Sequence, residues 1–376
     1  MEKSIWVDDL CQELIIENKS GSLLKDDSLC GVTVGAASLQ KTILNDSNYD
    51  EAVNLLIFEG YHSTEIYEKL IIDNARHLAD FLQEIYEKTN GKHGFVSLEI
   101  PPDLAYDTEG IIENARRYWQ ELDRSNVMIK IPATLEGLPA MSRLLEDGIN
   151  VDIYFLFDLA RYRQAVETYL ASLQMRMING KPLSHIQSMA SFYLDALEGV
   201  IYPMLDQIRD QDDWRAPIAA GLKNRFTTAC AFVAGQIYQE NFTSEDFRWL
   251  VDEGARPQRL LWAMGRGRSN DFSAPKYFDA LIGSGVINFL PVRNLHYQAL
   301  PESDLSPIEY TIDEAQEVFD QLSGIGIDLD QLTRELEAEA VAKTQKAYRE
   351  LLKAIDEQRR YVFKSSPKDG SAAKVK

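Results

Sequence analysis

Eight short apolar runs alternate along this sequence with longer segments of helical character. The runs are rich in Val, Ile, Leu and aromatic residues, as expected for strands buried in a parallel sheet. They lie at Ile5–Leu10, Gly31–Gly35, Phe95–Ile100, Val127–Ile131, Val151–Phe157, Ile186–Tyr193, Arg259–Ala263 and Val286–Leu290. Eight strands interleaved with helices favour a closed (β/α)8 barrel, the TIM-barrel fold, over an open sheet. We therefore predict an α/β protein of this class.

The segments between these runs are expected to form helices. Asp107 is the expected N-cap of an amphipathic helix, and further helices are expected at Leu138–Glu146, Leu159–Ser172 and Ala274–Ile282. Two longer gaps, near 38–92 and 197–255, are interpreted as helical insertions because no Pro/Gly/Ser-rich linker divides the chain.

We predict a single barrel domain over residues 1–363. Helices at 311–363 would extend it at the C-terminal side, where apolar residues recur with a helical period among many charges. Residues 364–376 are small, polar and basic, and they are expected to form a disordered tail.

Charge and cysteine content exclude several classes of function. The chain has 39 Lys and Arg against 59 Asp and Glu, a formal net charge of −20, whereas binding to nucleic acid or to an anionic membrane needs a surplus of cations. No apolar run is long enough to span a bilayer, and the first residues lack the apolar core of a secretory signal. The three cysteines have neither metal-type spacing nor an even disulfide set, so we expect a cytoplasmic protein.

Lys130 is the most informative residue at the predicted strand ends, where barrel enzymes carry their function. Its neighbours in sequence are isoleucines, and the alternation of a strand places them on the opposite face. A lysine inside the barrel loses solvation, which lowers the pKa of its ammonium group and makes the amine available to attack a carbonyl. The other interpretation, a lysine that reaches the rim or pairs with a carboxylate, stays open here.

Other ionisable residues follow neighbouring strands. Asp8 ends the first run and Glu99 the third; either they neutralise Lys130 or they transfer protons in a carbonyl reaction. Arg266 and Arg268 lie in a glycine-containing loop after the seventh run, a position where barrels often bind phosphate. This loop is either an anion cradle or a surface loop with solvated arginines. The five histidines show no metal-ligand spacing, so no metal site is expected.

Several segments resemble the transaldolase family, whose members form a Schiff base on a (β/α)8 barrel. The resemblance runs from Ile5 to about Pro291 and is closest to the longer bacterial type. It is carried by IWVDDL at 5–10, DTEG at 107–110, GINV at 148–151, RPQRLLWA at 256–263 and above all NVMIKIPATLEGLPA at 126–140. The family counterpart of the last segment carries the Schiff-base lysine.

The resemblance implies a role for three residues. Lys130 would form the Schiff base, Asp8 would act on the substrate hydroxyl during C–C cleavage, and Glu99 would act through a water on the carbinolamine. No cofactor is implied, because the lysine itself supplies the electrophilic iminium. The expected partner is a small carbonyl compound, a sugar or a sugar phosphate, and the chain is compatible with a monomer or a homodimer.

Strands two and five depart from the family pattern. The family's second strand ends in Thr-Ser-Asn-Pro, whose Asn binds substrate hydroxyls, whereas this chain has Thr33 and, at the Asn position, Gly35. In the fifth strand a family Asn becomes Asp152, and a family Thr that helps to hold the catalytic water becomes Tyr154. These four residues are expected to line the substrate site.

The phosphate-binding segments depart as well. Ser191 and Tyr193 lie in a run that matches the family's Ser-x-Phe-x-x-Arg, but Ala196 stands where the family Arg grips the phosphate. The family's Ser-Thr-Gly-Thr-Lys becomes MGRGR at 264–268, which keeps a cation at Arg268, adds one at Arg266 and loses the hydroxyls. Ser191, Tyr193 and the two arginines are nevertheless expected to contact substrate.

Three hypotheses follow from this pattern. The residues expected to form and process the Schiff base match the family, whereas those expected to bind substrate differ from it. This combination predicts a diverged transaldolase-like enzyme that makes or breaks C–C bonds of a polyhydroxy carbonyl compound. The first alternative is an ordinary pentose-phosphate transaldolase. The second is a non-catalytic binding protein on a transaldolase fold, in which Tyr154 fills the old pocket.

Overall fold

The computed structural model describes residues 5–8, 29–36, 39, 47–211, 213–223, 225–263, 286–291 and 310–365. Within these residues eight strands pair in chain order, each parallel to the next, and the last pairs with the first to close a barrel. The strands are β1 (Ile5–Asp8), β2 (Leu29–Val34), β3 (Phe95–Glu99), β4 (Val127–Pro132), β5 (Val151–Leu156), β6 (Ser188–Phe192), β7 (Arg259–Ala263) and β8 (Val286–Pro291). The predicted (β/α)8 fold class is confirmed.

Helices surround the barrel and fill the long gaps of the sequence. They are α3 (Ser47–Phe58), α4 (Ser63–Lys88), the short 3-10 helix η2 (Pro102–Leu104), α5 (Thr108–Leu122), α6 (Gly137–Asp147), α7 (Leu159–Ile178), α8 (Leu194–Arg209), α9 (Ala216–Leu222), α10 (Phe226–Phe242), α11 (Glu245–Asp252), α13 (Ile312–Gly324) and α14 (Leu329–Ser365). The helix expected at Ala274–Ile282 lies outside the described residues. Among the described helices, none is both long and apolar enough to cross a membrane.

Local capping explains where the helices next to the site begin and end. Asp107 accepts a hydrogen bond from the Gly110 backbone N–H at 3.0 Å, so it is the N-cap of α5, as predicted. Asp158 caps α7 in the same way through two backbone N–H groups. Gly148 ends α6 with a φ of 96°, a conformation that glycine adopts without strain. These caps fix the direction in which each strand passes into the next element.

The side chains of the strands form two layers. Residues that face the helices, such as Ile129 and Ile131, are fully buried in one continuous apolar core. Residues that face the barrel interior form a second cluster, drawn mostly from the starts of the strands: Trp6, Cys30, Phe95, Met128, Met189, Leu261 and Ala263. This apolar cluster fills one end of the barrel, and Glu99, Lys130 and Asp152 lie beyond it toward the carboxyl ends of their strands.

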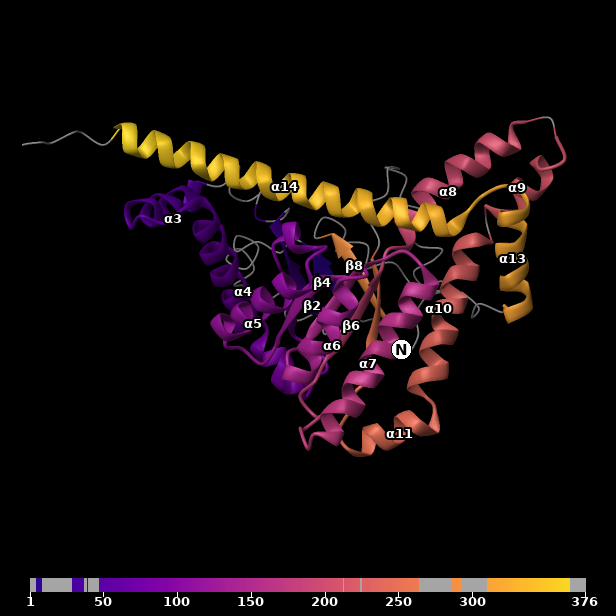
Figure 1. Ribbon diagram of the computed structural model, residues 1–376, viewed down its shortest axis with the longest axis horizontal. Helices are drawn as coiled ribbons and strands as arrows, with labels where there is room; N and C mark the ends of the chain where they lie inside the picture. Colours follow the sequence, from indigo (N-terminus) through magenta and orange to yellow (C-terminus); the bar gives the residue numbers. More distant parts are fainter. Residues whose placement is uncertain are drawn as a thin grey trace, which may run out of the picture.

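The long helix α14 lies across the end of the barrel toward which the strands point (Figure 1). Arg349 forms an ion pair with Asp103 of η2 at 2.8 Å, and the rings of Tyr348 and Tyr67 meet edge to face with centroids 4.9 Å apart. The helix runs to Ser365, two residues past the predicted end at 363, and residues 366–376 lie outside the described part. The carboxyl end of the barrel is therefore covered by the last helix of the chain.

Candidate active site

Neighbouring strands bring two of the three predicted catalytic residues together. Glu99 on β3 is the register partner of Lys130 on β4, and Lys130 is in turn the partner of Asp152 on β5. Residues paired in this way lie side by side on the same face of a sheet. A lysine thus stands between two carboxylates at the carboxyl end of the barrel, the end at which barrel enzymes hold their active sites.

Lys130 is held inside the barrel. Ile129 and Ile131 point outward into the helix-facing core, as the alternation predicted, and Lys130 itself is only 8% exposed. Its Nζ lies 4.9 Å from the centre of the Tyr154 ring, within the range of a cation–π contact. The amine therefore lies against an aromatic ring of β5, and the strand register places a carboxyl group on each neighbouring strand beside Lys130.

Glu99 and Tyr154 are joined directly. Tyr154 Oη donates a hydrogen bond to Glu99 Oε1 at 2.6 Å, and both side chains are buried. Burial raises the pKa of Tyr154 well above its usual value, and the charge of Glu99 and this hydrogen bond raise it further. The phenol is therefore neutral at physiological pH and keeps its proton to donate.

Asp152 lies beside Lys130 on the neighbouring strand β5. It is fully buried and accepts hydrogen bonds from Ser97 Oγ at 2.7 Å and from Ser191 Oγ at 2.8 Å. Burial raises the pKa of Asp152, while the charge of Lys130 and the two serine hydroxyls act in the opposite direction. Ser97 was missed from the sequence, although it shares the inward face with Glu99 two residues later.

Replacing Asp152 with asparagine is expected to change how stability depends on pH. Because the pKa of Asp152 is raised on folding, the folded state keeps this proton to higher pH than the unfolded state, whose aspartate pKa is about 3.9. The stabilisation that results is complete at pH values below the unfolded-state pKa. It is lost as pH rises through the raised pKa of Asp152 in the folded state. The free energy of unfolding of the wild type relative to Asp152→Asn should therefore fall over that interval, by about 1.4 kcal/mol for each pH unit that separates the folded and unfolded pKa values. Urea unfolding from pH 4 upward measures this difference, and a constant difference would contradict the prediction.

Gly35 is next to the Glu99 carboxylate. A Cβ atom built at Gly35 would overlap Glu99 Oε2, so a family-type Asn does not fit there while Glu99 keeps its position. Thr33 is buried on β2, where it is the register partner of Asp8 and Ser97. The loss of the Asn and the position of Glu99 are therefore linked features of one site.

Aromatic side chains wall the site on the side of β5 and β6. The Phe155 ring lies 4.1 Å from that of Tyr154 and 5.6 Å from that of Tyr193, which also contacts Phe157 at 5.5 Å, all between ring centroids. Phe155 has a φ of 64°, an uncommon conformation for a bulky residue. No sequence signal marks this residue, because the conformation arises where β5 shifts its register against β6.

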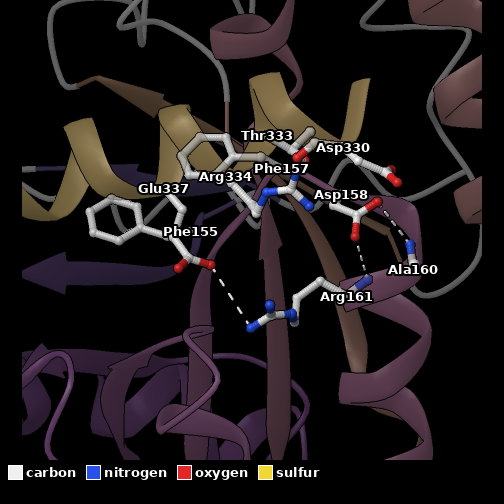
Figure 2. Close-up of a pocket in the computed structure, with 9 residues that line it drawn as sticks. All are labelled: Phe155, Phe157, Asp158, Ala160, Arg161, Asp330, Thr333, Arg334 and Glu337. Atoms are coloured by element: carbon white, nitrogen blue, oxygen red, sulfur yellow. Dashed lines mark hydrogen bonds and ion pairs between the residues drawn. The ribbon is translucent and has the colours of Figure 1, made fainter. Parts of the chain in front are cut away.

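A cavity of about 210 Å³, partly open to solvent, lies between α14 and the end of β5 (Figure 2). Arg161 reaches across it, donating to the Ala133 carbonyl at 2.8 Å and approaching Glu337 of α14 at 3.9 Å. Burial raises the pKa of Glu337, and the charge of Arg161 opposes that shift. The cavity is lined by Phe155 and Phe157 of the aromatic wall and by three carboxylates and two arginines.

The remaining predicted residues differ in how far the structure describes them. Asp8 ends β1, but its side chain lies outside the described part. Arg266 and Arg268 lie outside the described residues altogether. Among the described side chains, no group of three or more His, Cys, Asp or Glu residues is arranged to hold a metal ion.

Comparison with known proteins identifies the family. A profile of the transaldolase/fructose-6-phosphate aldolase family matches residues 5–355. The chain is 35% identical over 357 residues to a transaldolase of Saccharopolyspora erythraea, covering 94% of each chain. It is 33% identical to transaldolase 2 of a Nostoc species and 34% identical to a transaldolase of Mycolicibacterium smegmatis, again over 94% of each chain. The chain therefore belongs to the transaldolase/fructose-6-phosphate aldolase family and is a transaldolase-type enzyme.

Proposed function

We propose that the chain forms a Schiff base through Lys130 and makes or breaks C–C bonds of a polyhydroxy carbonyl compound. We further propose that the residues that bind this substrate differ from those of an ordinary transaldolase. The observation that carries this proposal is the position of Lys130, buried at the carboxyl end of β4 with a carboxylate on each neighbouring strand. An amine in such a setting can exchange protons with its neighbours and attack a carbonyl carbon.

The reaction proceeds through an iminium. The amine of Lys130 adds to the carbonyl carbon, and loss of water gives an iminium that withdraws electrons from the neighbouring carbons. The adjacent C–C bond then breaks when a base removes a proton from the next hydroxyl, a role assigned to Asp8. An aldehyde leaves, and the enamine on Lys130 adds to a second aldehyde or takes up a proton. Glu99 handles the proton transfers of the carbinolamine.

The substrate-binding shell supports a change of substrate. Gly35 offers no side-chain amide, and Tyr154 occupies space beside Lys130 with its ring. Ala196, on α8, carries no charge that could hold a phosphate. We infer a polyhydroxy aldehyde or ketone whose recognition differs from that of the pentose-phosphate transaldolases.

One alternative function has support from the comparisons. The similarity to proteins named transaldolase over 94% of the chain favours the exchange of dihydroxyacetone units between sugar phosphates. In that case Arg266 and Arg268 would supply the phosphate contacts.

Borohydride trapping distinguishes these proposals. The protein is incubated with fructose 6-phosphate, fructose or glycolaldehyde, reduced, and mapped by peptide mass spectrometry. An adduct on Lys130 from fructose 6-phosphate, with turnover when erythrose 4-phosphate is added, would establish the ordinary transaldolase. An adduct on Lys130 only from the unphosphorylated compounds would support the altered shell. The absence of any adduct on Lys130 would contradict the Schiff-base assignment and favour a binding role.

A further inference from the structure

The contact between Tyr154 and Glu99 leaves no space for an intervening water. Tyr154 Oη lies 2.6 Å from Glu99 Oε1, a direct hydrogen bond between two buried side chains. In the arrangement that the family resemblance implies, a threonine and a glutamate share a bound water instead. In this chain the phenol oxygen takes up the place next to the carboxylate.

The same phenol is held against the reactive amine. The ring centre lies 4.9 Å from Lys130 Nζ, and the Phe155 ring packs against it. The backbone is fixed as well, because the Tyr154 carbonyl accepts a hydrogen bond from the Ala133 N–H at 2.7 Å. Tyr154 therefore contacts both the carboxylate on β3 and the amine on β4, with few alternative positions open to its ring.

We propose that the Tyr154 hydroxyl passes protons between Glu99 and the carbinolamine formed on Lys130. This inference rests on the function proposed above, and it makes Tyr154 a catalytic residue, because its hydroxyl is bonded to Glu99 while its ring lies against the amine that would carry the carbinolamine. A phenol suits the task since it donates one proton and accepts another at the same atom. Its raised pKa keeps it protonated between transfers.

The transfers balance without a further reactant. Starting from an ammonium on Lys130 and a carboxylate on Glu99, Tyr154 Oη takes a proton from Nζ while its own proton passes to Glu99. The amine attacks the carbonyl carbon, and one proton moves from nitrogen to oxygen to give the neutral carbinolamine. Tyr154 then protonates the departing hydroxyl and regains a proton from Glu99. The C–O bond breaks, water leaves, and the nitrogen lone pair forms the iminium.

The test is Tyr154→Phe, which removes the hydroxyl and keeps the ring. Loss of oxygen-18 from the labelled carbonyl of fructose 6-phosphate and of fructose reports iminium formation independently of C–C cleavage. General acid–base groups contribute about 100-fold or more to rate, so exchange in Tyr154→Phe should fall by about that factor, and its pH profile should change. Tyr154→Thr, which leaves room for a water beside a hydroxyl, should recover part of the loss.

Tyr162→Phe is the matched control. Tyr162 is a fully buried tyrosine on α7 whose ring packs against Phe192, so this variant also loses one buried hydroxyl and should exchange oxygen at the wild-type rate. If Tyr154→Phe exchanged oxygen within about threefold of the wild-type rate, the role inferred for the Tyr154 hydroxyl would be wrong, while the proposed function would stand. A wild-type protein that neither exchanges oxygen nor forms an adduct would instead refute the proposed function.

Discussion

Lys130→Ala should form no borohydride-stable adduct with any carbonyl compound that labels the wild type. Its kcat/KM should fall by at least about 1,000-fold, since removing the nucleophile of a covalent mechanism removes the whole pathway rather than one contact. Stability should fall, because the substitution removes the cation that lies between Glu99 and Asp152 and leaves a buried carboxylate without its compensating charge. Single-turnover trapping followed by intact-protein mass spectrometry measures the adduct, and steady-state kinetics measure the loss.

Lys353→Ala is the control for this variant. Lys353 is an exposed lysine of α14 whose side chain is 77% accessible, so its removal should leave adduct and turnover unchanged. If Lys130→Ala kept the adduct, and the label mapped to another lysine, the assignment of the nucleophile would be wrong even though the family assignment would stand.

Gly137→Ala should destabilise the fold by about 2–3 kcal/mol, the usual cost of forcing an extra methyl into a packed site. A Cβ atom at Gly137 would overlap the backbone carbonyl oxygen of Pro132, and backbone cannot rotate away as a side chain can. The Gly137 N–H also donates to Thr134 Oγ1 at 3.0 Å, which fixes the turn between β4 and α6. Because Pro132 follows Lys130 by two residues in the same strand, activity should fall together with stability.

Gly199→Ala gives the comparison. Gly199 lies within α8, and a Cβ atom there would meet nothing within 4 Å, so the change should be neutral or should stabilise the helix by up to about 1 kcal/mol. Urea unfolding of both variants measures the difference. Equal free energies of unfolding would show that the β4–α6 turn adjusts more easily than its geometry indicates.

The sequence predicted which strands carry the residues of the site, but it did not predict the hydrogen bonds and ring contacts between those residues. Strand positions and the inward direction of Lys130 follow from apolar runs and from a period of two, both of which are local properties of the chain. The bond between Tyr154 and Glu99 joins residues 55 apart, and nothing in either segment specifies it. The conformation of Phe155 and the contacts of Tyr348 with Tyr67 likewise depend on packing between distant segments. Contacts between residues so far apart in the chain cannot be predicted from residue propensities or from hydrophobic periodicity.

The position of α14 has a consequence for synthesis of the protein. All eight strands lie before residue 292, whereas the helix that covers their carboxyl ends begins at Leu329. Domains fold as the chain emerges from the ribosome, starting from the N-terminal side. The strands are therefore synthesised before the helix that covers them, and the ion pairs of Arg349 and Glu337 can form only once that helix has been made. Among the described residues, those that cover the candidate site are thus the last to be synthesised.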